Sequence, residues 1–359
     1  MFRIHMLPAH QGDCLWIEYG QPGQTQRILI DGGPPATYAE ALRKRIEDIP
    51  GERRFELLVV THVDTDHIGG ILKLLDKPPQ ELRFDEVWFN AWQHIAPGLL
   101  GGLDGEILTK QLNRMGWPWN SSFSKAAGQA AVVPETGGLP TRTMPGGMRL
   151  TVLSPGAAQL KALQRDWLSV CRAAGLEPGT PAAKLKSIAA RKGIKLLGDP
   201  RLPLQAWAAK TTTLDDTSAN GSTIALLAEY EGKGCLFAGD GFSPVLAASI
   251  RRLPQMHPGK RLTLSALKLP HHGSARNVTS ELLELVSCNR FLFSTNGAIF
   301  GHPDREAVAR VILYGGPNPT LSFNYKTPFN ELWAGKKVMA DFSHRVEYGD
   351  AQEGLVVEL

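Results

Sequence analysis

Ten consecutive residues, 61–70, place four side chains of the kind that bind metal ions directly after an apolar stretch, 55–60, typical of a buried strand. The four side chains are His62, Asp64, Asp66 and His67. Ligands at positions i, i+2, i+4 and i+5 can converge from one turn, and imidazole with carboxylate suits divalent transition metals. A single Asp here could simply cap the following helix, but a cap does not require four such groups. The motif therefore predicts a strand–loop–helix unit carrying a metal site, in which Gly69 and Gly70 let the helix approach closely.

Short apolar segments bounded by Gly and Pro predict strands in both halves of the chain. The first three, at 2–7, 14–19 and 27–31, are expected to form a β-meander. Helices are expected at 38–46 and 71–75. Further strands are expected at 87–90, 148–153, 223–229, 234–238, 266–269 and 291–294. Strands interleaved with helices indicate an α/β fold.

Two stretches interrupt the strand pattern and are expected to be insertions in a single domain that spans 1–359. Residues 92–147 are rich in Gly, Pro and Trp, and residues 156–216 are first helix-forming and then broken by Pro. The second stretch holds ten Lys or Arg against five Asp or Glu, an excess larger than the net +4 of the whole chain. A local basic excess can attract a polyanion, although a solvated helical face is the alternative explanation.

The chain contains no apolar run near the roughly 20 residues that span a bilayer, so no membrane insertion is expected. Its N-terminal segment lacks the pattern of a secretory signal, and we expect a cytoplasmic location. Four cysteines lie far apart without a C-x-x-C pair, which argues against a disulfide framework and a structural zinc knuckle. They are Cys14, Cys171, Cys235 and Cys288, and we expect buried thiols.

Other polar side chains follow predicted strands. Asp240 comes after the strand at 234–238, the pair His271 and His272 after 266–269, and His302 beyond 291–294. Loops that leave strand ends commonly aim side chains into a site. Asp31 closes the third strand, where it either supports the site from behind or forms a tight turn.

The order of these motifs resembles the metallo-β-lactamase superfamily. Within it, Gln11-Gly-Asp13, Asn220-Gly-Ser222 and Gly301-His-Pro303 are similar to the metallohydrolase domain of ComEC-type competence proteins. The motif set covers roughly residues 1–90 and 148–315. The resemblance implies a four-layer αββα sandwich with a dinuclear metal site at one edge.

The superfamily pattern also implies roles for individual residues. It makes His62 a ligand of the first metal, Asp66 and His67 ligands of the second, and Asp240 a bridge between the two. One histidine of the 271–272 pair would complete the second site. His271 is slightly preferred for that position, but both histidines remain candidates.

The sequence departs from the superfamily pattern at the first metal. Asp64 stands where most members have histidine, and the third motif offers only Asn220 or Ser222 in place of a histidine. The first site would therefore be rich in oxygen, which favours harder ions. We expect two divalent metal ions, with manganese or magnesium as plausible as zinc.

Such a centre is expected to hydrolyse phosphodiesters in DNA or RNA through metal-activated water. Asp66 would orient the nucleophile and His302 would protonate the leaving group. Lys268 and Ser274 would contact a phosphate. For these two side chains and for His302, packing behind the site is the alternative explanation. The basic excess of 156–216 fits a nucleic-acid substrate.

Two other functions remain open. The same fold could hydrolyse a small ester, lactone or cyclic nucleotide, with Trp residues roofing an apolar pocket, although aromatic side chains also stack on single-stranded bases. These are Trp88, Trp92, Trp117 and Trp119. Alternatively, a non-catalytic metal-binding scaffold could bind a protein partner through its insertions. The sequence decides neither the kind of nucleic acid nor the oligomeric state.

Overall fold

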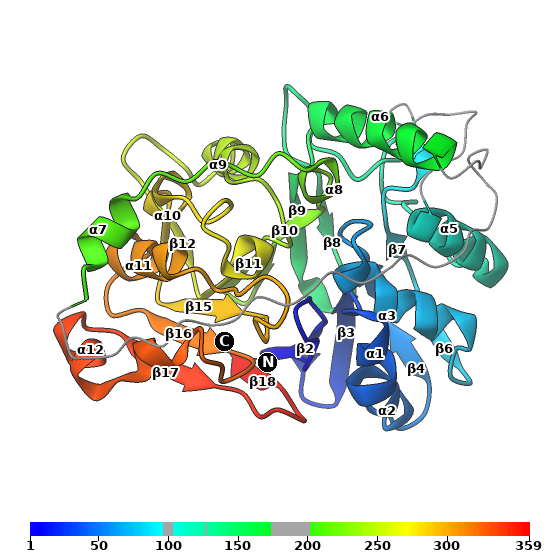
Figure 1. Cartoon of the computed structure of the whole chain (residues 1–359). Coiled ribbons are helices and arrows are strands. Elements are labelled where there is room, and N and C mark those ends of the chain that lie inside the picture. The colour runs from blue at the N-terminus through cyan, green and yellow to red at the C-terminus, as the bar shows by residue number, and fades with distance from the viewer. Residues whose placement is uncertain (96–102, 126–127, 174–201) are drawn as a thin grey trace.

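The computed structural model describes residues 1–95, 103–125, 128–173 and 202–359 (Figure 1). It contains two large mixed sheets. The first has the strand order β18 (Leu355–Glu358), β1 (Phe2–Met6), β2 (Leu15–Gln21), β3 (Gln24–Ile30), β5 (Leu57–Val59), β7 (Val87–Trp88). The second has the order β17 (Arg345–Tyr348), β16 (Thr320–Phe323), β15 (Arg290–Phe293), β13 (Ala266–Lys268), β11 (Lys233–Phe237), β10 (Ala225–Tyr230), β9 (Arg149–Ser154), β8 (Thr141–Thr143).

The described structure also contains α-helices, two small strand pairs and short 3-10 or π-helical turns. The turns are Tyr38–Leu42, Pro145–Gly147, Pro270–Gly273 and Glu331–Ala334. The strand pairs are β4 (Arg53–Phe55) with β6 (Leu82–Phe84) and β12 (Leu262–Leu264) with β14 (Val286–Cys288). The helices are α1 (Pro35–Thr37), α2 (Arg43–Glu47), α3 (Thr65–Asp76), α4 (Trp92–Ile95), α5 (Leu103–Met115), α6 (Ala157–Ala173), α7 (Leu204–Ala209), α8 (Ser218–Gly221), α9 (Ser243–Arg251), α10 (Ser280–Glu284), α11 (Arg305–Tyr314) and α12 (Lys336–Asp341). The predicted mixed α/β fold is confirmed.

Strand side chains alternate between separate apolar cores, as the two-residue period of a strand requires. In β10, Leu226 and Ala228 belong to the core shared by the two sheets, whereas Ala225 and Leu227 belong to the core under helices α9, α10 and α11. In β5, Leu58 packs with helix α3 in a third core. Both sheets are therefore buried on two faces over their central strands.

Helix α3 begins earlier than the sequence predicted. The expectation was a helix at 71–75, but α3 starts at Thr65, after the extended Asp64. Its interior glycines are explained by close packing, since a Cβ atom on Gly70 would lie 1.9 Å from the carbonyl oxygen of Gly32. The expected close approach of this helix is confirmed, and Asp66 and His67 lie in its first turn rather than in a loop.

Both predicted insertions contain regular structure. In 92–147, β8 pairs with β9 and extends the second sheet. In 156–216, α6 and α7 are helical, but most of the basic side chains lie in 174–201, outside the described residues. Cys14, Cys235 and Cys288 are buried free thiols, as predicted. Among the described helices, none is both long and apolar enough to span a bilayer.

Candidate metal centre

Strand ends from both sheets converge on one cluster of His and Asp side chains. β3 and β5 are parallel neighbours in the first sheet, and so are β11 and β13 in the second. Parallel neighbours end at the same edge, so their carboxyl-terminal loops lie together. A backbone hydrogen bond of 2.9 Å from Ile224 N to Thr61 O joins the two edges. The predicted motif loops therefore meet between the sheets.

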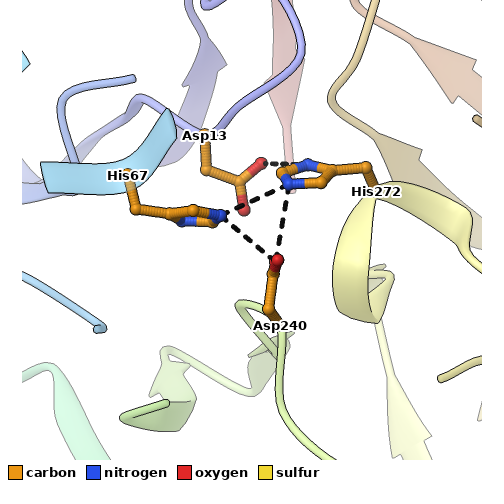
Figure 2. A group of neighbouring side chains, drawn as sticks. All are labelled: Asp13, His67, Asp240 and His272. Carbon is orange, nitrogen blue, oxygen red and sulfur yellow. Dashed lines mark hydrogen bonds and ion pairs between the residues drawn. The ribbon is translucent and has the colours of Figure 1, made fainter. Parts of the chain in front are cut away.

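One group, which we call the His67 position, brings two imidazoles onto one oxygen of Asp240 (Figure 2). His67 Nε2 lies 3.3 Å and His272 Nε2 lies 3.6 Å from Asp240 Oδ1, and the two nitrogens are 3.3 Å apart. Asp66 Oδ2 approaches His272 Nε2 at 3.6 Å. The structure thus places His272, rather than the slightly preferred His271, beside His67.

The Nδ1 nitrogens of His67 and His272 already have hydrogen-bond partners. His67 Nδ1 donates to Asp31 Oδ2 at 2.8 Å, and His272 Nδ1 donates to Ser294 O at 2.8 Å. Both Nε2 atoms therefore face the interior of the group, where Asp240 Oδ1 has no hydrogen-bond partner among the described residues. Imidazoles oriented by an outer partner and facing a carboxylate fit a divalent cation.

The pKa shifts of the residues in the His67 position also fit a divalent cation. Burial lowers the pKa of His67, but Asp240 and Asp31 outweigh it and hold that pKa well above its usual value. Burial raises the pKa of Asp240, yet the neighbouring histidines bring it well below the usual range. These opposite shifts mean that the His67 imidazole and the Asp240 carboxylate stabilise each other's charged forms. A bound divalent ion would supply positive charge to the carboxylates in place of a proton on His67.

A second group, the His62 position, lies on the other oxygen of Asp240. His62 Nε2 is 3.6 Å from Asp64 Oδ2 and 4.0 Å from Asp240 Oδ2. This nitrogen is buried and has no hydrogen-bond partner among the described residues. His271 Nε2 lies 3.7 Å from the same Asp240 oxygen. The two oxygens of Asp240 therefore face two separate sets of candidate ligands.

The two residues predicted to replace the third-motif histidine differ in their contacts. Asn220 Nδ2 donates to Asp215 Oδ2 at 2.6 Å and lies 3.4 Å from His271 Nδ1, while Asn220 Oδ1 is buried without a hydrogen-bond partner among the described residues. Ser222 Oγ donates to Ala219 O at 2.6 Å, a contact within its own turn.

Neither predicted phosphate contact has a side chain that faces solvent. Lys268 is completely buried and its ammonium pairs with Asp13 and with Leu269 O. Ser274 is also buried, and its oxygen accepts from Arg276 N at 3.3 Å. The end of β13 directs Lys268 inward, so packing accounts for both residues.

His302 lies beside the His62 position. Its ring centroid is 5.5 Å from that of His271, and its Nδ1 is 3.5 Å from Asp304 Oδ1. Burial lowers its pKa despite Asp304. On its other side the ring stacks with Phe300 at 6.0 Å between centroids, and Phe300 is exposed.

Sequence reasoning missed two acidic residues near the centre. Asp13 belongs to the cluster with His67, Asp240 and His272, and its Oδ1 lies 3.3 Å from His272 Nδ1. Burial raises the pKa of Asp13, but Lys268 and His272 outweigh this and hold it below the usual range. Only the Gln11-Gly-Asp13 motif signalled it.

The other missed residue, Asp215, contacts His271 Nδ1 at 3.3 Å. It lies in a stretch that the sequence presented only as a possible insertion, so no local pattern pointed to it.

Residues 7–115 match the metallo-beta-lactamase superfamily. The matched span includes Asp13, Asp31 and the whole 61–70 motif, whereas Asp240, His271 and His272 lie beyond it. Metallo-beta-lactamase proteins are in general hydrolases that bind divalent metals, and the His and Asp cluster here is able to hold one. No curated protein matches the chain significantly.

Proposed function

We propose that this protein is a dinuclear metal-dependent phosphodiesterase that cleaves nucleic acid. One observation carries the proposal: the two oxygens of Asp240 face two different pairs of His side chains, at 3.3–3.6 Å on one side and 3.7–4.0 Å on the other. A carboxylate placed in this way is suited to bridge two ions. Two divalent ions would activate water and neutralise charge on a phosphoryl oxygen.

The ligand sets support both the number and the kind of ion. The His67 position would be held by Asp66, His67, Asp240 and His272, and the His62 position by His62, Asp64 and Asp240. Carboxylate and imidazole are mixed at both positions, and each position includes two carboxylates. That composition supports manganese or magnesium as well as zinc.

Side chains at the rim would handle the substrate. Asp66 is partly exposed and faces the His67 position, where its free oxygen would accept a proton from the attacking water. His302 borders the His62 position and would donate a proton toward the leaving oxygen. Phe300, exposed and stacked on His302, offers a face on which a base can stack.

The test is cleavage of labelled single-stranded DNA, double-stranded DNA and RNA with manganese, magnesium or zinc added. We expect metal-dependent cleavage that Asp240→Asn lowers by at least about 100-fold, because both positions lose their shared oxygen. The matched control is Asp216→Asn, a side chain that is 88% exposed, which should cleave like the unmodified protein.

Intact nucleic acid under every metal, from protein shown to have bound metal, would refute the proposal. Turnover of a small ester or lactone by the same preparation would then point to a small-molecule hydrolase. Metal binding without turnover of either substrate would indicate a scaffold that binds a protein partner. Raising the salt concentration distinguishes a nuclease from a small-molecule hydrolase, because nucleic-acid binding weakens steeply as salt rises.

A further inference from the structure

The His62 position has an incomplete ligand set in the sequence. His62 and Asp64 supply two side chains beside the shared Asp240, and no histidine stands at the third motif. The amide nitrogen of Asn220 donates to Asp215 and Ser222 donates to Ala219 O, while Asn220 Oδ1 is buried without a hydrogen-bond partner among the described residues. A nitrogen ligand, like the histidine that the third motif lacks, therefore has to come from another part of the fold.

His271 supplies a suitable nitrogen from an unexpected place. Its Nε2 lies 3.7 Å from Asp240 Oδ2, the same oxygen that His62 Nε2 approaches at 4.0 Å. Ligand atoms that share an ion at roughly 2.0–2.2 Å lie about 3–4 Å from one another. The spacing on both sides of Asp240 Oδ2 is of this size.

The opposite edge of the His271 ring is held by buried polar groups. Nδ1 lies 3.0 Å from Asn277 Oδ1 and 3.3 Å from Asp215 Oδ2. Asp215 is buried, and it accepts hydrogen bonds from Asn220 Nδ2 at 2.6 Å and Asn277 Nδ2 at 3.0 Å. A proton on Nδ1 would thus be shared with these oxygens, which leaves the Nε2 lone pair facing Asp240. Metal-binding histidines are commonly oriented in this manner.

The backbone explains how two adjacent histidines can reach one carboxylate. His271 and His272 both have left-handed conformations, with φ values of 47° and 54°. Each such residue costs about 1–2 kcal/mol, so the loop must be held by other contacts. His271 N donates to Gly239 O at 2.9 Å and Ser274 N donates to His271 O at 2.8 Å. Adjacent side chains in a strand would point to opposite faces, whereas here each ring reaches a different oxygen of Asp240.

We infer that His271 is the remaining ligand of the His62 position, in place of the absent third-motif histidine, and that Asp215 and Asn277 position its ring. The inference rests on the proposed dinuclear centre. Asp215 is a positioning residue, since it acts through His271. The consecutive histidines thus divide between the two positions, His271 to one and His272 to the other.

The test measures bound manganese rather than turnover. Metal-free protein is titrated with Mn²⁺ by calorimetry, and the electron paramagnetic resonance spectrum reports whether two ions lie close together. We expect two ions and a coupled spectrum for the unmodified protein. His271→Ala should keep one site and lose the coupled signal, and Asp215→Asn should weaken one site by about 10–100-fold while the other is unchanged.

His257→Ala is the matched control, because His257 is exposed and should behave as the unmodified protein does. Thermal melting of the metal-free proteins checks that each variant folds. If His271→Ala does not fold, His271→Gln, which keeps a long polar side chain, takes its place with the same expected result.

Two outcomes overturn the inference. Two coupled ions in a folded His271 variant would do so while leaving the proposed dinuclear enzyme intact. A single ion in the unmodified protein would overturn the inference and the dinuclear part of the proposed function together. Nuclease assays do not enter this result, so failure of the nucleic-acid substrate leaves the inference standing.

Discussion

Asp31→Asn removes the carboxylate oxygen that accepts a hydrogen bond from His67, with little change in side-chain shape. Asp31 is completely buried. Its Oδ1 accepts from Thr61 N at 2.8 Å, and its Oδ2 accepts from Thr61 Oγ1 at 2.7 Å and from His67 Nδ1 at 2.8 Å. An asparagine can keep the backbone bond and donate to the hydroxyl of Thr61. Its amide would then face the Nδ1 hydrogen of His67, donor against donor.

The expected magnitude follows from that single lost acceptor. Removing the outer partner of a metal-binding histidine lowers metal affinity by about 10–100-fold, which is about 1.4–2.7 kcal/mol. Leaving a buried donor unpaired lowers the free energy of unfolding by about 1–3 kcal/mol. Asp31→Asn should therefore weaken both manganese binding at the His67 position and the fold itself.

Calorimetric titration with Mn²⁺ and urea unfolding of the metal-free protein measure the two effects separately. Glu56→Gln is the control, since Glu56 is also a buried carboxylate and accepts from Arg27 N away from the centre. It should change stability without changing manganese affinity. An Asp31→Asn variant that binds manganese as tightly as the unmodified protein would refute the assigned role of Asp31.

Three further predictions concern the fold and the bound metal. Gly70→Ala should lower the free energy of unfolding, measured by urea denaturation, by at least about 1–3 kcal/mol, because its Cβ would lie 1.9 Å from Gly32 O. Gly138→Ala, which has open space around it, should leave that free energy unchanged. The hydrogen bond with His5 lowers the pKa of Glu18 from 4.5 to about 2 against the effect of burial. This carboxylate therefore adds stability above its unfolded pKa that is lost as pH falls through about 2. In chemical unfolding, Glu18→Gln should be less stable by about 1–3 kcal/mol at pH 7 and by less than about 0.5 kcal/mol at pH 2; a constant difference would contradict this. Chelation should lower the melting temperature by a few degrees, since ligand at 100 times its Kd stabilises by about 2.7 kcal/mol, and an unchanged melting curve would argue against a resident ion.

Local pattern was sufficient to propose the first half of the candidate site. The apolar stretch before residue 61 and the spacing of His62, Asp64, Asp66 and His67 depend on neighbours within one strand and one turn. The start of α3 was placed too late because glycine lowers helix propensity. What outweighs propensity there is the close contact of Gly70 with Gly32, a residue from a different strand end.

The sequence identified the candidate ligands in the second half of the site, but it did not show which metal position each of them belongs to. His271 and His272 are chemically identical, and only a left-handed loop at the edge of the second sheet decides which oxygen of Asp240 each ring meets. The burial of Lys268 was likewise not visible in the sequence, because it depends on the face of the sheet to which the strand directs its side chain.

The sequence by itself determined the chemistry available to this protein: imidazole and carboxylate at strand ends, in a chain with enough alternating apolar residues to bury two sheets. Only the tertiary structure decided which of these groups meet. Asp13 and Lys268 are 255 residues apart, and Asp215 reaches His271 from 56 positions away. The first pair forms because strands of two packed sheets end at one edge, and the second because the segment between α7 and α8 packs against the loop of His271. No local spacing encodes either relation.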